Sequence, residues 1–149
     1  MKKITFIAIT LLAALFVGCN RNVPETFHGN VARPDWTAPE HNDMTASMTA
    51  VIEVDLKTQY PDIAADFVIS DDDLLAAFAG EQCLGVVGPN ENVFFLYINQ
   101  PDPSSLITLR YWSAQYRNLF EAPDAFPFSN DEHLGTLAQP LVPNFKVVK

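Results

Sequence analysis

The chain has 149 residues, of which 48% are hydrophobic, and it carries 9 basic and 18 acidic side chains. This length and apolar content indicate one domain with a single core and argue against a chain that is disordered throughout. The formal charge of −9 argues against nucleic acid as a partner, because a surface that binds nucleic acid is basic.

Residues 1–18 have the pattern of an export signal. Lys2 and Lys3 precede a mostly apolar run over residues 4–17. A helix of that length spans about 21 Å, less than a hydrocarbon core of about 30 Å, so we interpret the run as a cleaved signal peptide. Without it, 7 basic residues remain against 18 acidic ones, a formal charge of −11.

The leader ends in Leu15-Phe16-Val17-Gly18-Cys19, which resembles the lipobox of bacterial lipoproteins, although Phe16 replaces the usual leucine. The resemblance implies that Cys19 becomes the new N-terminus and carries a diacylglycerol and an acyl chain such as palmitate, which anchor the protein in a membrane. The residue after this cysteine is Asn20. An aspartate at that position would favour retention in the inner membrane, so Asn20 is compatible with attachment to the outer membrane. Whether the protein faces the periplasm or the outside stays open, and so does the alternative of an ordinary secretory signal with an incidental Cys19.

Residues 19–39 are polar and contain three prolines, a composition that predicts a flexible tether between the anchor and a domain over residues 40–149. About twenty extended residues reach roughly 65 Å. Trp36 is a candidate to dock on the domain where the tether ends. With Cys19 acylated, Cys83 is the remaining thiol, so stability must come from packing and not from a disulfide.

The first predicted strand covers residues 44–55, where apolar side chains occupy the even positions and polar ones the odd positions, except Val51. This period of two predicts a strand with one face on a core and the other in water. Pro61 is suited to the first position of one helical turn over residues 61–66, and residues 67–69 have the composition of a strand.

Residues 74–79 and 82–87 flank Gly80-Glu81, which predicts a hairpin with a type II′ turn. After a turn at residues 88–92, the run over residues 93–98 is apolar at every position, which favours a central strand.

A further strand is predicted over residues 106–112, with a partner over residues 116–121 and a closing strand over residues 145–148. Four prolines in residues 123–143 predict an ordered excursion across the edge of the fold. Short strands at this spacing favour an all-β fold, a single immunoglobulin-like β-sandwich.

The stretch over residues 72–87 resembles a domain that recurs in envelope lipoproteins and surface proteins of Bacteroidetes. An acidic turn is followed by Ala76-Ala77-Phe78, Gly80 and Cys83-Leu84-Gly85, and the likeness covers residues 36–122. It implies an exported β-sandwich with no assigned catalytic residues. Ser113-Ala114 departs from the aspartate that commonly follows the aromatic residue there. From the residues alone, Gly85 permits close backbone approach and Cys83 is a small side chain facing the core.

Two clusters could carry chemistry. Cys83 and His133 could form a nucleophile and base, against the alternative of a buried, inert cysteine. The acidic turn could bind calcium, with Asp43, or Asp131 and Glu132, as further ligands, although consecutive acids in a turn usually face solvent. The three residues of that turn are Asp71, Asp72 and Asp73.

Aromatic side chains could bind a ligand by stacking on sugar rings. Trp112 is the preferred candidate because it shares the predicted outer face of its strand with Arg110; Tyr116 and Trp36 are further candidates, and the alternative is that all of them cover the sandwich. We therefore expect a non-enzymatic envelope lipoprotein, without a cofactor, that binds or scaffolds a protein partner. A glycan-binding accessory and a small hydrolase are the alternatives.

Overall fold

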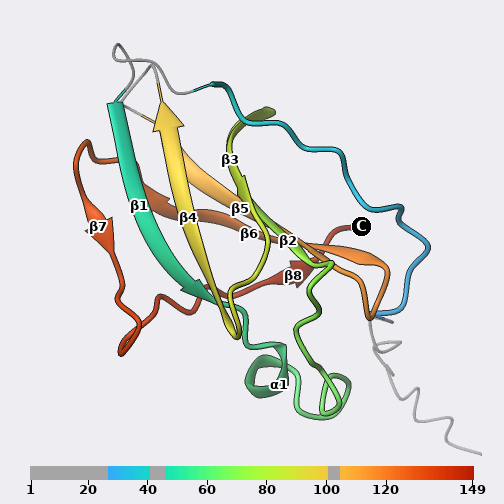
Figure 1. Ribbon diagram of the computed structural model, residues 1–149. Helices are drawn as coiled ribbons and strands as arrows, with labels where there is room; N and C mark the ends of the chain where they lie inside the picture. Colours follow the sequence, from blue (N-terminus) through green and yellow to red (C-terminus); the bar gives the residue numbers. More distant parts are fainter. Residues whose placement is uncertain (1–26, 41–45, 101–104) are drawn as a thin grey trace, which may run out of the picture.

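The structure, a computed structural model, describes residues 27–40, 46–100 and 105–149. Two β-sheets of three and five strands pack face to face, with one short helix at one end (Figure 1). The predicted β-sandwich is thereby confirmed at the level of two packed sheets. The leader and Cys19 lie outside the described residues. Within the described ranges, no helix is long and apolar enough to cross a membrane.

The three-stranded sheet has the order β4-β1-β7. Its central strand, β1 (Ala46–Glu53), pairs antiparallel with β4 (Val93–Gln100) and parallel with the short β7 (His133–Leu134). The even positions of β1 are buried at Met48 and Ile52, which confirms the alternation predicted for this strand in its described part.

The five-stranded sheet has the order β3-β2-β5-β6-β8. Its strands are β2 (Leu74–Ala79), β3 (Gln82–Val87), β5 (Leu106–Ser113), β6 (Asn118–Pro127) and β8 (Lys146–Val147). The predicted hairpin of β2 and β3 is confirmed: Ala79 pairs with Gln82, and Gly80 has the positive φ of +59° that the turn requires.

The backbones of β3 and β4, which belong to different sheets, come into close contact at one point. A Cβ atom at Gly85 would overlap the carbonyl oxygen of Tyr97, so this contact between two backbones requires glycine. The close approach predicted for Gly85 is therefore confirmed.

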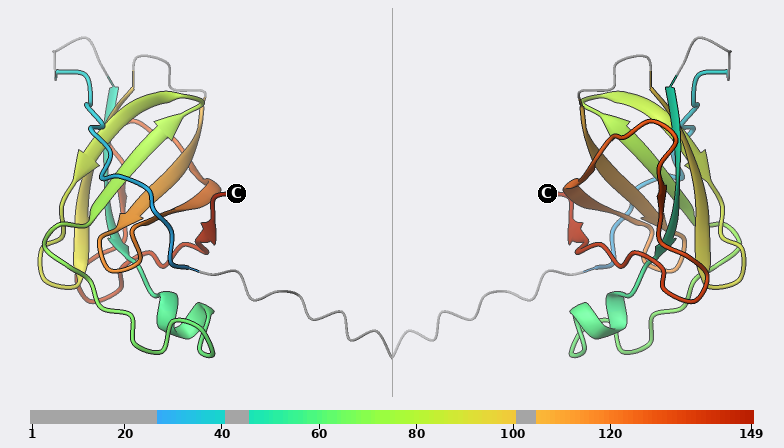
Figure 2. Two further views of the ribbon diagram at one scale, coloured as in Figure 1. Left: turned by 90° about the vertical axis from the view of Figure 1, so that its right-hand side faces the viewer. Right: turned by 90° about the vertical axis from the view of Figure 1, so that its left-hand side faces the viewer.

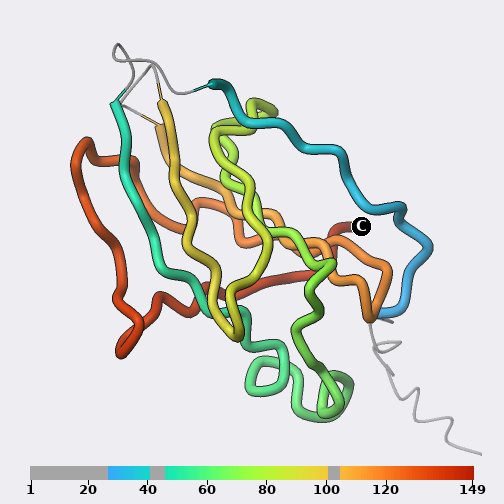
Figure 3. Tube along the Cα trace, viewed as in Figure 1, coloured from blue at the N-terminus to red at the C-terminus, as the bar shows by residue number. Residues whose placement is uncertain are grey.

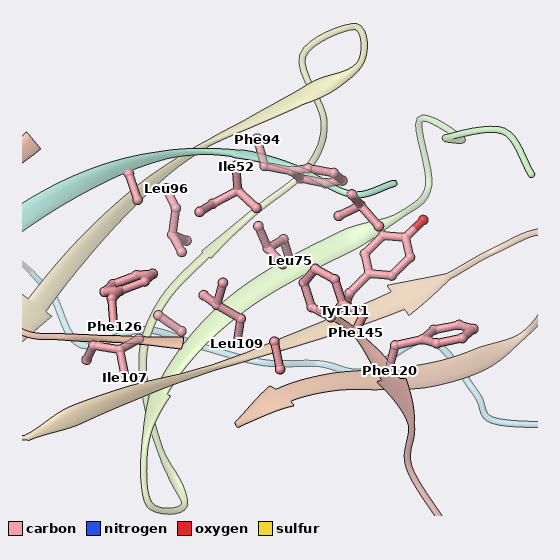
Figure 4. Close-up of a cluster of buried hydrophobic side chains, with 14 of the residues drawn as sticks. Ile52, Leu75, Phe94, Leu96, Ile107, Leu109, Tyr111, Phe120, Phe126 and Phe145 are labelled. Atoms are coloured by element: carbon pink, nitrogen blue, oxygen red, sulfur yellow. The ribbon is translucent and has the colours of Figure 1, made fainter. Parts of the chain in front are cut away.

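The core lies between the two sheets, where side chains of both layers interdigitate (Figure 4). The Tyr111 ring meets Phe94 of the opposite sheet at a ring distance of 5.9 Å, and Phe145 at the same distance. The other labelled members are Ile52, Leu75, Leu96, Ile107, Leu109, Phe120 and Phe126. Packing of apolar side chains is thus what holds the layers together.

The helix begins earlier than predicted. α1 spans Leu56–Gln59, because the Asp55 carboxylate caps it by accepting a hydrogen bond from the Thr58 amide at 3.0 Å, and Leu56 is fully buried. Residues 61–66 form turns, and residues 67–69 are not a strand, so both of those predictions are wrong.

Strand β4 is an edge strand of its sheet, and the prediction of a central strand is wrong. Phe95 and Tyr97 point away from the core and are 41% and 43% exposed.

Only part of the excursion predicted over residues 123–143 lies outside regular strands, because β6 extends into it. Strand β6 continues through Pro123, which is accommodated where the register with β5 shifts. The chain then crosses to the other sheet, where β7 and Leu141 lie along β1, and returns to form β8. It therefore does cross the edge of the sandwich, as expected.

Residues 27–40, here called the strap, run along the outer side of the five-stranded sheet from the α1 end to the opposite end (Figures 2 and 3). Phe27 is buried in the core cluster, and the Gly29 and Val31 amides donate hydrogen bonds to the carbonyls of Tyr116 and Arg117, both at 2.9 Å. Residues 27–39, whose composition predicts a tether, thus lie against the sheet in this structure.

Candidate functional site

The strap covers the sheet face that was predicted to bind a ligand. Among the described residues, four buried apolar side chains lie outside the core cluster, on the outer face of the five-stranded sheet: Leu74, Ala76, Phe78 and Trp112. Trp112 is 6% exposed, and its indole Nε1 donates a hydrogen bond to the Val31 carbonyl at 3.1 Å.

Trp36 contacts the same cluster, with its ring edge-on to Phe78 at 5.6 Å. The expectation that Trp36 docks on the domain is thereby confirmed. Trp36 thus helps to shield the Phe78 ring from solvent.

Arg110 is engaged within the molecule. Its guanidinium lies 4.3 Å from the centre of the Phe78 ring and makes ion pairs with Glu121 at 3.0 Å and Glu81 at 3.2 Å. These partners hold the side chain against the sheet. Arg110 is therefore part of the covered face, and its guanidinium is engaged by Phe78 and two glutamates within the molecule.

Tyr116 is 1% exposed and belongs to the core cluster. Its hydroxyl donates to the Asp66 carboxylate at 3.3 Å, and burial raises the pKa of this phenol to about 12. These four candidate residues thus do not form one exposed site. Trp112 and Tyr116 are buried, two glutamates hold Arg110, and Trp36 is half-buried beside Phe78.

The three carboxylates of the acidic turn lie in different environments, two in solvent and one in the interior. Asp73 is fully buried: one carboxylate oxygen accepts a hydrogen bond from the Ala114 amide at 2.8 Å, and the other accepts from the Tyr111 hydroxyl at 2.5 Å and the Ser70 amide at 3.1 Å. Burial raises the pKa of Asp73. This carboxylate joins the ends of β2 and β5.

The structure does not assemble the predicted calcium site. Asp71 and Asp72 are exposed while Asp73 points inward, and Asp131 lies elsewhere, beside Ser47 of β1. Asp43 is outside the described residues. Across residues 27–40, 46–100 and 105–149, no three His, Cys, Asp or Glu side chains converge on a point where a metal ion could bind.

Cys83 and His133 are also apart. Cys83 pairs with Phe78 on the outer face of its sheet, so the prediction that it faces the core is wrong; the register shift in the hairpin leaves Leu84 in the core instead. Burial raises the pKa of the Cys83 thiol. The His133 ring, on β7, shares a hydrogen bond of 2.5 Å with Thr49.

An exposed surface that the sequence did not reveal lies on the outer side of the three-stranded sheet. We call it the β1–β4 face; it consists of Thr49, Val51, Glu53, Val93, Phe95 and Tyr97. Phe95 lies opposite Val51 and Tyr97 opposite Thr49, so two aromatic rings stand next to each other on one strand with aliphatic and polar neighbours.

The edge position of β4 is the information that sequence reasoning lacked. Phe95 and Tyr97 occupy alternate positions, which is a period of two, but an uninterrupted apolar run conceals which of its two faces is buried. Only the pairing of β4 with β1 identifies the exposed side.

A cavity of about 300 Å³ lies at the α1 end, between the end of β1 and residues 67–69. Glu53, Lys57 and Asn92 contribute to its walls, as does Asp55, whose carboxylate already caps α1. The cavity brings no nucleophile and base together.

Comparison with known proteins found no matching family model, no matching curated protein and no matching solved structure.

Proposed function

We propose that this protein is a non-enzymatic lipoprotein of the cell envelope, anchored through a lipid on Cys19 to the outer membrane, and that its β1–β4 face binds a protein partner. The observation that carries the binding role is the exposure of Phe95 and Tyr97, 41% and 43%, side by side on one sheet face. Aromatic residues are enriched at the centres of protein interfaces.

The surroundings of the two rings favour a protein over a sugar. Val51 and Val93 extend the apolar area, and Glu53 lies at its margin. The whole chain is acidic, with a formal charge of −9. A partner with an apolar patch bordered by lysine or arginine side chains would complement this face in both shape and charge.

The absence of enzymatic activity is part of the same proposal. In the part of the chain that the structure describes, Cys83, His133 and the buried Asp73 lie on separate elements and make structural contacts. The immunoglobulin-like class of the sandwich and the resemblance to the Bacteroidetes envelope domain are proposed with it, supported by the two packed sheets and by the hairpin that carries the signature.

Site-specific photocrosslinking in living cells tests the binding role. A photoreactive phenylalanine analogue at position 95 should capture one defined protein, whereas the same analogue at Leu137, which is 69% exposed at another site, should not. The purified partner should lose at least about tenfold in affinity with Phe95→Ala, which corresponds to about 1.4 kcal/mol, and should keep its affinity with Leu137→Ala.

Equal crosslinking at positions 95 and 137 would contradict the proposal. Tyr97 with its hydroxyl, beside Thr49 and His133, also gives this face the combination of flat ring and polar groups that binds sugars. Binding to a neutral polysaccharide that Phe95→Ala abolishes, without any crosslinked protein, would replace the protein partner with a glycan.

A further inference from the structure

The strap fixes the point at which the chain enters the domain. Phe27 packs edge-on against Tyr60, directly after α1, at 4.8 Å, and its carbonyl accepts a hydrogen bond from the Asn118 side chain at 2.9 Å. Tyr60 and Asn118 belong to the end of the sandwich that carries α1 and the turn between β5 and β6 (Figure 1). The chain therefore enters at this end, which we call the α1 end.

The spacer between the proposed anchor and this entry point is short. Cys19 and Phe27 are eight residues apart in the sequence, and eight extended residues reach at most about 26–29 Å. A tether that ran free to residue 39 would reach more than twice as far. Because the strap is packed on the sheet, its residues do not lengthen the spacer between the proposed anchor and the domain.

We infer that the α1 end faces the bilayer and that the opposite end, which carries the Gly80-Glu81 turn, points away from it. This inference rests on the proposed lipid at Cys19. The seven steps of β5 from Leu106 to Ser113 alone cover about 23 Å, so an inverted domain would require the spacer to be stretched almost to its limit.

The chemistry of the α1 end fits a zwitterionic lipid surface. Its exposed apolar side chains are Ile63 and Val68, at 38% and 58%. Among its exposed charged side chains, five acidic ones outnumber three basic ones: Asp62, Asp66, Asp71, Asp72 and Glu91 against Arg33, Lys57 and Arg117. An excess of acidic groups is repelled by anionic headgroups but tolerates neutral ones, so we expect contact with phosphatidylethanolamine or phosphatidylcholine.

The test measures which end of the full lipidated protein lies near the membrane. Val68 and Leu106 are 58% and 53% exposed at opposite ends, so Val68→Cys and Leu106→Cys form a matched pair, each made in a Cys83→Ala background and labelled with an environment-sensitive fluorophore. The proteins are reconstituted into phosphatidylcholine vesicles that contain a lipid with a nitroxide on its headgroup. We expect the label at position 68 to be quenched several-fold more than the label at position 106.

Two further measurements complete the design. A Gly-Ser insertion of about twenty residues after Asn22 should abolish the difference between the two labels, because it lengthens the spacer without touching the strap. Replacing part of the phosphatidylcholine with phosphatidylglycerol should reduce quenching at position 68.

Equal quenching of the two labels with the natural spacer, or stronger quenching at position 106, would overturn the orientation while leaving the anchor intact. A mass spectrum that shows no lipid on Cys19, together with a protein that does not float with vesicles, would overturn the anchor itself. The two failures are therefore distinguishable.

Discussion

At the scale of single residues, the environment of Asp73 depends on partners that are far away in the sequence. Asp71, Asp72 and Asp73 are chemically identical in the sequence, and the pattern of the turn predicts solvent or a cation for all three alike. The structure separates them, because Tyr111 and Ala114, far along the chain, donate hydrogen bonds to Asp73 alone. No local pattern could have identified which of the three carboxylates is buried.

Removing the Asp73 carboxylate should destabilise the fold by about 3 kcal/mol, since Asp73→Ala leaves the buried hydroxyl of Tyr111 and the half-buried amides of Ala114 and Ser70 without this acceptor. Tyr111→Phe is the matched control, with an expected loss of about 1 kcal/mol, because the carboxylate keeps its two amide donors. Urea unfolding followed by circular dichroism measures both. An equal loss in the two variants would show that the carboxylate does not act as the shared acceptor.

At the scale of elements, the sequence predicted those features that depend on residues close together in the chain. The alternation of β1 and the hairpin around Gly80 are both local patterns, and both are confirmed. The errors concern relations between strands: β4 is an edge strand, and β6 continues through Pro123 because a register shift with β5 makes room for it. The exposed aromatic residues were missed for the same reason.

Two glycines of the β2–β3 hairpin should differ sharply in their tolerance of alanine. Gly85→Ala places a methyl group on the Tyr97 carbonyl of β4, so the strands must separate, at an expected cost of more than about 3 kcal/mol. Gly80→Ala meets no atom within 4 Å and should cost only about 1–2 kcal/mol for its positive φ. Thermal unfolding of the two variants decides the matter, and comparable midpoints would speak against the close contact of β3 with β4.

At the scale of the whole molecule, the strap changes the boundary of the folded unit. The composition of residues 19–39 is that of a linker, and prolines and polar side chains do favour extended chain. Extended chain can still pack, and here one buried ring, backbone hydrogen bonds and an indole contact fasten it to the sheet. A composition rule cannot distinguish a free linker from one that has a complementary surface to lie on.

Phe27→Ala should therefore cost about 3–5 kcal/mol, as expected for a large side chain removed from a core, although it lies in a segment with the composition of a linker. Val31→Ala is the control from the same strap; Val31 is 38% exposed, and its main-chain hydrogen bonds survive the substitution, so we expect a loss below about 1 kcal/mol. If Phe27→Ala unfolds at the same denaturant concentration as the unaltered protein, the strap is not part of the cooperative unit.

The chain contains two tryptophans, and the strap brings both to the same place: Trp36 lies in the strap, and Trp112 lies beneath it. Intrinsic indole emission thus monitors the seam between strap and sheet, whereas the far-ultraviolet signal monitors the sandwich. If the strap detaches from the sheet before the two sheets separate, indole emission and the far-ultraviolet signal will change at different denaturant concentrations. An unlabelled sample then shows which event comes first.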